Sequence, residues 1–181
     1  MKTIAYILIP LLFLTACKTA QKATPEQAAA TKALVTEGNY EITFSRANPL
    51  NTSEMAQLSS ANLLPMDSRA GQINLVGTTN YIKKHNDSLQ VYLPYYGTRQ
   101  IGSSMNDNNA AIEFEGIPET YEVTYDEAKQ RSTVKVVFKE RSEQYNLWLT
   151  VEANQRVHAR VNSTQRTAIG YRGELSPSSK D

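Results

Sequence analysis

The stretch VKVVFKERSEQYNLWLTV, residues 134 to 151, decides the fold. Val134, Val136 and Phe138 recur at every second position, and after a short polar turn the same period returns from Tyr145 to Val151. A period of two with one apolar face is typical of an antiparallel strand that is buried on one side only. A polar turn this short joins neighbouring strands into a hairpin. The stretch therefore predicts a β-hairpin with one buried face and one solvent-exposed face.

The same period of two recurs on both sides of this hairpin. It is found in the segments 40–44, 121–125 and 157–161, and brief polar turns occur at 85–88, 126–130, 153–155 and 162–165. Strands do not alternate with helices, which disfavours a parallel sheet. About nine or ten strands do not stay flat with an open apolar face. We therefore expect an all-β antiparallel meander that rolls into a lipocalin-like barrel or a sandwich.

One α-helix is predicted at the start of the domain, over residues 24–37. In TPEQAAATKALVTEG, Thr24 is a typical N-cap, Gln27 completes a capping box, and Gly38 follows the end. Its apolar stripe, Ala30, Ala33 and Leu34, is expected to lie against the β domain of residues 38–175. The segment 47–71 lacks a clean period and predicts a long loop with a short helical turn at 54–59. Residues 176–181 are expected to form a disordered tail.

The first residues predict export and a lipid anchor. Lys2 precedes the apolar run IAYILIPLLFL, which is too short to span a membrane and is typical of a signal peptide over residues 1–16. The following LTAC, Leu14 to Cys17, resembles the lipobox of bacterial lipoproteins, in which the cysteine becomes the first residue and is lipidated. The alternatives are an ordinary signal peptide with a coincidental cysteine, or a buried apolar helix with a free thiol.

An unpaired cysteine in an exported protein needs an explanation, and lipidation of Cys17 supplies one. Residues 17–23 then form a lipidated tether. Lys18, where inner-membrane lipoproteins carry aspartate, favours the periplasmic face of the outer membrane by resemblance to lipoproteins of two-membraned bacteria. The membrane is thus an expected partner through the lipid.

Composition argues against nucleic acid as a partner. The chain has 19 Lys and Arg against 18 Asp and Glu, a formal net charge of +1, with no basic stripe evident in the sequence. Its two histidines and single cysteine do not supply the three or four ligands of a zinc site. No cofactor or metal is expected.

Two stretches, SLQVYLPYYG at 88–97 and NSTQRTAIGYRGEL at 162–175, resemble the exported lipoproteins of Bacteroidetes classed as domain of unknown function 4251. That family has an Asp-Ser turn, a Leu-Pro-Tyr-aromatic-Gly stretch and a C-terminal pattern. The C-terminal pattern is matched here by Asn162 or a neighbour, Arg166, Ile169, Tyr171 and Gly173. The resemblance covers residues 34 to 175. It implies the fold and export but no activity, because the family is defined by sequence.

The candidate ligand-binding residues are Tyr92, Tyr95, Tyr96 and Arg99. Tyrosines joined by Pro and Gly at a strand end can form an aromatic lip for sugars, lipids or peptides, or they can cap the barrel. Ser88 is a candidate O-glycosylation site because Asp87-Ser88-Leu89 resembles the Bacteroidetes acceptor, although the triplet is also a normal hairpin turn.

Four arginines, at 156, 160, 166 and 172, crowd the last two predicted strands. They could bind an anionic ligand, but cross-strand pairing with Glu152 and Glu174 is the favoured interpretation. The chain has no Gly-x-Ser-x-Gly elbow and no phosphate loop, so no catalytic residue is assigned. We expect a non-enzymatic envelope lipoprotein that binds a small apolar ligand, a glycan or an envelope protein. A carboxylate-based hydrolase of envelope glycans and a purely structural scaffold are the alternatives.

Overall fold

The structure is a computed structural model that describes residues 23–50, 52–100 and 111–178. The predicted signal peptide, Cys17 and most of the predicted tether lie outside the described residues. No helix within these three ranges has both the length and the apolar character needed to cross a bilayer.

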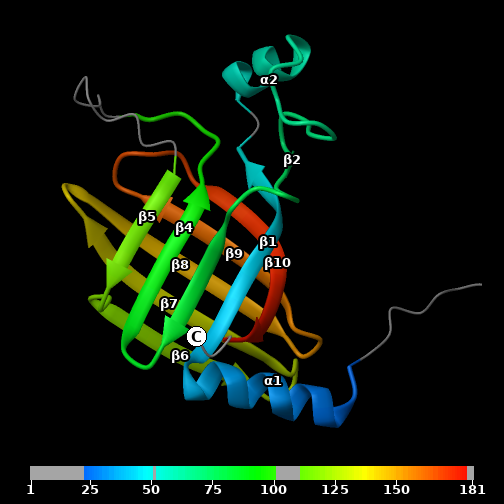
Figure 1. Ribbon diagram of the computed structural model, residues 1–181, viewed down its shortest axis with the longest axis vertical. Helices are drawn as coiled ribbons and strands as arrows, with labels where there is room; N and C mark the ends of the chain where they lie inside the picture. Colours follow the sequence, from blue (N-terminus) through cyan, green and yellow to red (C-terminus); the bar gives the residue numbers. More distant parts are fainter. Residues whose placement is uncertain (1–22, 51, 101–110, 179–181) are drawn as a thin grey trace, which may run out of the picture.

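The described chain forms one curled antiparallel sheet and two helices (Figure 1). The elements in chain order are α1 (Pro25–Glu37), β1 (Asn39–Pro49), α2 (Ser53–Ser60), β2 (Ile73–Asn74), β3 (Tyr81–His85), β4 (Ser88–Pro94), β5 (Ala111–Gly116), β6 (Thr120–Asp126), β7 (Arg131–Glu140), β8 (Glu143–Glu152), β9 (Arg156–Ser163) and β10 (Ile169–Pro177). The strand order is β5-β4-β3-β1-β10-β9-β8-β7-β6, and β2 pairs with β1. The first strand therefore lies in the middle of the sheet, next to the last.

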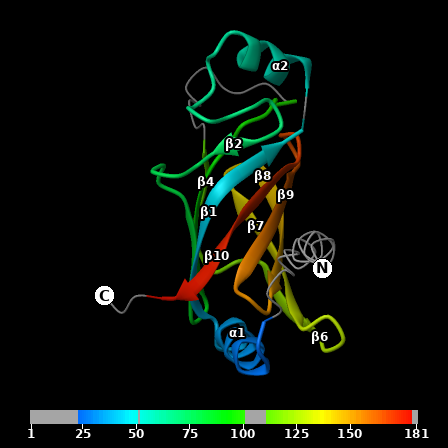
Figure 2. The same ribbon diagram turned by 90° about the vertical axis from the view of Figure 1, so that its right-hand side faces the viewer.

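The sheet folds over into a half-barrel, so that strands from its two ends face each other (Figures 1 and 2). Phe114 of β5 meets Phe138 of β7 with ring centroids 4.6 Å apart. Strands β5 and β6 stand at the two ends of the strand order. The predicted all-β antiparallel fold with an N-terminal helix is confirmed.

The concave face of the half-barrel is filled by apolar side chains. Alternate residues of strands such as β7, β8 and β9 are buried in it, and side chains such as Ile42, Ile82, Leu147 and Leu149 are fully buried. Each such side chain contributes roughly 1.5–3 kcal/mol relative to exposure. Because this face is packed, a ligand must be sought on the outer face or at the rim.

Helix α1 begins and ends as the sequence predicts, but it buries a different stripe. Thr24 and Gln27 form the capping box, and Gly38 adopts the left-handed conformation past the helix end. The buried side chains are Ala28, Thr31 and Val35. The predicted stripe is wrong for Ala30 and Ala33, which are exposed, because Thr31 Oγ1 donates to the carbonyl of Ala153 and sets the rotation of the helix.

Two boundaries differ from the sequence prediction. The expected helical turn at 54–59 is a capped helix of eight residues, α2, because the Thr52 side chain accepts a hydrogen bond from Met55 N. Strand β10 continues to Pro177, two residues beyond the expected end of the β domain, because the backbone of 176–177 pairs with β1. Helices α1 and α2 lie at opposite ends of the half-barrel (Figures 1 and 2).

Candidate functional site

The predicted tyrosine lip is part of the packed rim of the half-barrel. The hydroxyl of Tyr95 lies 2.8 Å from the hydroxyl and 3.0 Å from the carbonyl oxygen of Thr167, in the loop between β9 and β10. Burial raises the pKa of the Tyr95 phenol, and the same holds for Tyr96, which packs against the core. The Arg166 guanidinium carbon lies 5.1 Å from the centroid of the Tyr95 ring.

Beneath Tyr95 lies a buried ion pair that the sequence interpretation missed. Arg166 Nε donates to Glu143 Oε2 over 3.2 Å, and the Ser163 hydroxyl donates to the other carboxylate oxygen. Arg99 Nη2 approaches the same carboxylate at 3.6 Å and donates to the Gln165 side chain at 2.9 Å. The expected pairing of Arg166 with Glu152 or Glu174 is wrong, because Arg166 turns into the rim and away from the outer face.

These residues form what we name the rim clasp, made of Tyr95, Arg99, Glu143, Arg166 and Thr167. Both stretches that carry the family resemblance meet here, since Tyr171 of β10 also donates its hydroxyl to Pro94 O at 2.9 Å. Burial holds the pKa of Tyr171 well above its usual range, so the phenol stays a donor. The clasp joins the end of β4 to the β9–β10 loop, which is a structural role.

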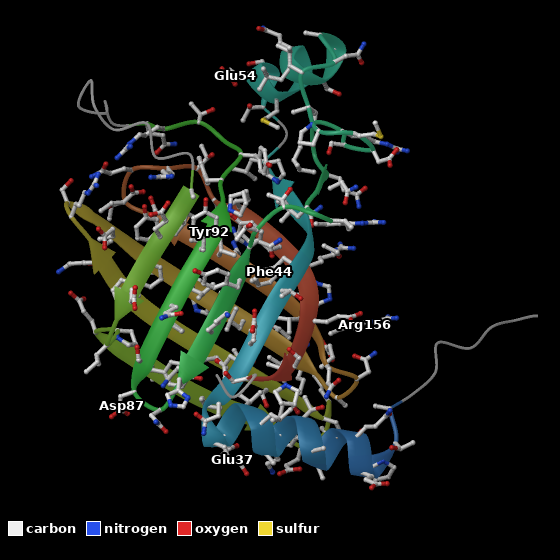
Figure 3. The ribbon with its side chains drawn as sticks, in the orientation of Figure 1. Glu37, Phe44, Glu54, Asp87, Tyr92 and Arg156 are labelled. Atoms are coloured by element: carbon white, nitrogen blue, oxygen red, sulfur yellow. The ribbon has the colours of Figure 1, made fainter. Side chains whose placement is uncertain are left out.

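The four predicted ligand-binding residues do not converge on one site. Tyr95 and Arg99 belong to the rim clasp and Tyr96 packs beside it. Tyr92, labelled on β4 in Figure 3, stands on the outer face of that strand, stacked on Tyr81 with ring centroids 6.0 Å apart. Ser88 is exposed at the first position of β4, after Asn86, whose φ of 50° confirms the left-handed turn expected there.

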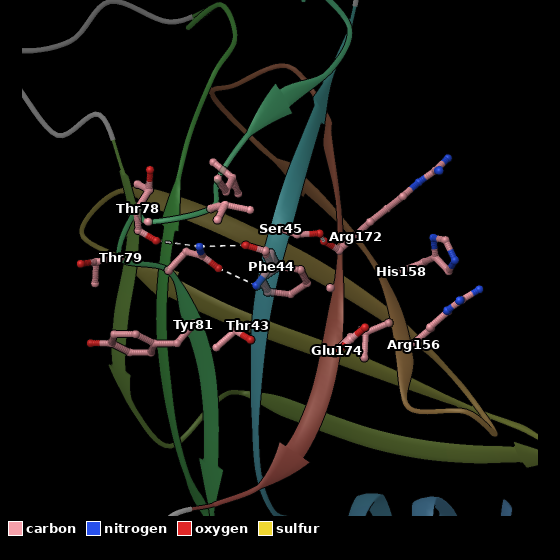
Figure 4. Close-up of a pocket in the computed structure, with 16 residues that line it drawn as sticks. Thr43, Phe44, Ser45, Thr78, Thr79, Tyr81, Arg156, His158, Arg172 and Glu174 are labelled. Atoms are coloured by element: carbon pink, nitrogen blue, oxygen red, sulfur yellow. Dashed lines mark hydrogen bonds between the residues drawn. The ribbon is translucent and has the colours of Figure 1, made fainter. Parts of the chain in front are cut away.

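A larger hollow, which we name the outer groove, lies on the outer face of the sheet (Figure 4). Its volume is about 720 Å³, and it runs between the segment 75–80 and strands β1, β10 and β9. Tyr81 lies at one end, and Arg156, His158 and Arg172 lie at the other (Figure 4). The hydroxyl groups of Thr43, Ser45, Thr78 and Thr79 are also in the lining.

Asn80 holds the wall of the outer groove in place. Between the β1–β3 and β1–β2 ladders, its buried amide replaces the missing strand partner of Phe44. Asn80 Oδ1 accepts from Phe44 N at 2.6 Å, and Nδ2 donates to the carbonyl oxygens of Phe44 and Thr78 at 3.0 and 2.9 Å. The dashed lines in Figure 4 mark the bonds from Asn80.

Replacing Asn80 with Ala is expected to lower the free energy of unfolding by about 1–3 kcal/mol, because the buried N–H and C=O of Phe44 lose their partners. Urea unfolding followed by circular dichroism measures this loss. Thr79→Ala, at the exposed neighbouring position, is the matched control and should change stability by less than about 0.5 kcal/mol. Equal effects of the two substitutions would contradict the role of Asn80.

A row of basic side chains begins at one end of the groove and continues across the outer face beyond it. Arg46 of β1 stands opposite Arg172 of β10, which stands opposite His158 of β9. We name these three residues the basic row. All three are exposed, and the like charges of Arg46 and Arg172, directly opposite each other in the sheet, are destabilising by roughly 0.2–1 kcal/mol. Neighbouring strands lie about 4.8 Å apart, so the row spans roughly 10 Å.

The two arginines of the basic row and the neighbouring Arg156 have no carboxylate partner within the described chain. In residues 23–50, 52–100 and 111–178, no carboxylate oxygen lies within 4.0 Å of the guanidinium nitrogens of Arg46, Arg156 or Arg172. Glu174 lies opposite Arg156 in the ladder and offsets part of the charge. The arrangement leaves an unpaired positive surface that fits an anionic group.

The arginines at 156, 160 and 172 indicated a positive surface on the last two strands. The sequence did not indicate that Arg46 would align with them across the sheet. Arg46 lies on a distant part of the chain and joins the row because a bulge shifts the β1–β10 register between Phe44 and Arg46. In the parts of the chain that are described, His, Cys, Asp and Glu side chains form no group of three or more that could hold a metal ion.

The comparisons with known proteins identify similarity of fold and family. A family model described as a domain of unknown function, DUF4251, matches residues 22–175. The crystal structure of a DUF4251 family protein from Bacteroides eggerthii DSM 20697 has a TM-score of 0.54 and 8% identity, and covers 84% of this chain and 88% of that chain. No curated protein matches the chain. At this identity the solved structure supports the fold alone.

Proposed function

This chain belongs to the DUF4251 family, and from that membership and the outer groove we propose that it is a non-enzymatic binding protein of the cell envelope that holds a glycan on its outer face. The observation that carries the proposal is the groove's combination of size and lining. A volume of about 720 Å³ lies within the usual range of ligand sites, roughly 300–1,000 Å³. The packed concave face leaves the outer face as the better-supported position for a ligand.

The lining of the groove supports a glycan in preference to an apolar ligand. Hydroxyl groups such as those of Thr43 and Thr78 can donate to and accept from sugar hydroxyls. The ring of Tyr81 offers an apolar surface with a polar end, and Arg172 supplies fixed donors for a charged or polar group.

The hydrolase alternative has less support than the outer groove: Glu113, Glu115 and Glu140 line a separate hollow, but its volume of about 350 Å³ is half that of the groove. Catalysis by two carboxyl groups requires both of them to face the substrate in a cleft. Glu143, which is buried, is already engaged by Arg166, Ser163 and Arg99. A filled half-barrel without a ligand would be a scaffold, and the glycan experiment below distinguishes that alternative from binding.

The test is a glycan array that carries neutral and acidic glycans, probed with the labelled full chain in detergent. We expect at least one glycan to be bound, and expect Arg172→Gln to weaken that signal by about tenfold. Lys129→Gln removes the same charge at the exposed turn between β6 and β7 and should leave the signal unchanged. An array without any bound glycan would argue for a scaffold, and equal signals from all three proteins would mean that the glycan binds away from the outer groove.

The proposal includes anchoring of the protein through lipid on Cys17 to the periplasmic face of the outer membrane. The chain from Cys17 to the start of α1 at Pro25 reaches at most about 30 Å. That length is short, so the α1 end would stay close to the bilayer and the outer groove would remain free to face the periplasm.

Replacing Cys17 with Ala is expected to abolish incorporation of labelled fatty acid and to move the protein from the membrane fraction to the soluble fraction, because the anchor depends on that thiol. Fractionation and autoradiography of expressing cells measure both effects. Thr15→Ala is the control, since it leaves the cysteine in place. Membrane association that survives Cys17→Ala would contradict the anchor.

Ser88 is proposed as an acceptor for O-glycosylation. Its exposed position after the Asn86-Asp87 turn leaves room for a glycan on the hydroxyl. The native protein should then show a larger intact mass than the Ser88→Ala variant by more than one oxygen atom. Identical masses after allowance for the substitution would exclude the modification.

A further inference from the structure

We propose that the ligand of the outer groove is an acidic polysaccharide whose chain continues out of the groove along the basic row, across β10 to β1. This inference rests on the proposed function and names the class of its ligand. It uses a feature that a site confined to the groove does not require, namely the alignment of Arg46 with Arg172 and His158 on three adjacent strands.

The first support is the position of Arg46. Arg46 is not part of the groove lining, but it stands directly opposite Arg172, which lines the groove. An exposed arginine opposite another arginine, without a carboxylate within 4.0 Å in the described chain, is unfavourable in the absence of an anion. A ligand with negative groups along its length would remove this repulsion at successive positions, whereas a ligand with a single charge would satisfy one position only.

The second support is the β-bulge in β1. The register with β10 shifts between Phe44 and Arg46, so both Ser45 and Arg46 are exposed at this point, and Ser45 also lines the groove. Bulges commonly redirect side chains at binding surfaces. Here the bulge places a hydroxyl group in the groove beside a cation outside it, and so connects the groove with the basic row.

The third support is the continuation of polar and aromatic chemistry on the other side of the row. Arg160 of β9 is exposed two residues beyond His158 and stands opposite Trp148 of β8, which is half-buried on the same outer face. An indole ring can pack against the apolar face of a sugar. The outer face therefore offers positions for a saccharide chain longer than the groove.

The same surface fits a nucleic acid less well. Nucleic-acid-binding domains are strongly basic overall and commonly present several aromatic rings for stacking. This chain has a formal net charge of +1, and Glu174 stands within the positive surface opposite Arg156. Local positive charge on a nearly neutral chain, beside hydroxyl groups, favours a polymer of sugars with spaced acidic groups.

The test is isothermal titration of the detergent-solubilised full chain with sodium polygalacturonate. Dextran serves as the neutral polymer and galacturonate as the single acidic unit. We expect binding of polygalacturonate that weakens as salt increases, and no comparable binding of dextran or galacturonate. Arg46→Gln should weaken the affinity by about threefold to fivefold, the range of one exposed ion pair. Lys129→Gln, with the same change in charge, should have no effect.

The outcomes separate this inference from the proposed function. Galacturonate that binds as tightly as the polymer and ignores Arg46→Gln would overturn the extended ligand and leave the groove as a glycan site. Equal binding of dextran would overturn the acidic class. Equal or tighter binding of a short DNA duplex would overturn the polysaccharide. Failure of polygalacturonate to bind would overturn the inference, and the glycan array then decides independently whether the groove binds any glycan.

Discussion

An Arg166→Met chain is expected to lose about 3 kcal/mol of unfolding free energy, because the buried Glu143 carboxylate then keeps only the more distant cation of Arg99, 3.6 Å away. Glu143 is 3% exposed and Arg166 is 8% exposed, so water cannot replace the lost partner. Urea unfolding followed by the fluorescence of Trp148, the single tryptophan of the chain, measures the change.

Two further variants make this result specific to the buried pair. Arg172→Met, on the same arginine-rich part of the chain, removes an exposed arginine and should leave stability unchanged or raise it by up to about 1 kcal/mol, since it relieves the repulsion from Arg46. The double variant Glu143→Leu, Arg166→Met should recover part of the loss, since an apolar pair avoids the buried charge. A loss below about 1 kcal/mol for Arg166→Met would mean that the rim clasp does not hold the fold together.

Gly173→Ala is expected to destabilise the fold by about 3 kcal/mol, because the new methyl group collides with backbone and not with a movable side chain. A Cβ atom at this position would lie 2.0 Å from the carbonyl oxygen of Thr43 and 2.7 Å from the Cα of Phe44. Strand β1 would have to move away from β10 at the bulge. The same movement would separate Arg46 from Arg172, so binding at the basic row should weaken as well.

Gly170→Ala is the matched control on the same strand. A Cβ atom there would have its nearest neighbour at 3.6 Å, an ordinary contact, so stability should stay the same or rise slightly. Thermal unfolding of the two variants, monitored by circular dichroism, gives the comparison. If Gly170→Ala and Gly173→Ala unfold at the same temperature, the close approach of β1 to Gly173 is not a constraint on the fold.

The strands could be predicted because their signal is local. The alternation of Val134, Val136 and Phe138 indicates which face of the strand is buried. A hairpin with a short turn can be predicted from the same local stretch, without information from elsewhere in the chain. The capping box of Thr24 and Gln27 is local for the same reason. The rotation of α1 was predicted wrongly because it depends on a bond from Thr31 to Ala153, which is distant in sequence.

The candidate site was less predictable because its parts meet only after folding. In the sequence, Glu143 lies in a predicted turn, and no neighbouring residue distinguishes it from the exposed carboxylates. In the structure it is the buried ion-pair partner of Arg166. The family pattern includes Arg166 and Tyr171, which make hydrogen bonds at the rim of the half-barrel, and Gly173, which leaves room for the close approach of the β1 backbone. The residues that carry the family resemblance therefore stabilise the fold, whereas most of the residues that line the outer groove lie outside the two resembling stretches.

The most direct measurement is a map of amide chemical-shift changes in the isotope-labelled protein during titration with an oligosaccharide of galacturonate. We predict that the largest changes fall on the groove and basic row, at Ser45, Thr78, His158 and Arg172, and that Arg172→Gln needs about ten times more oligosaccharide to reach the same changes. Changes concentrated instead at Tyr95 and Tyr96, with none on the outer face, would contradict the central claim that this protein binds its ligand on the outside of the half-barrel.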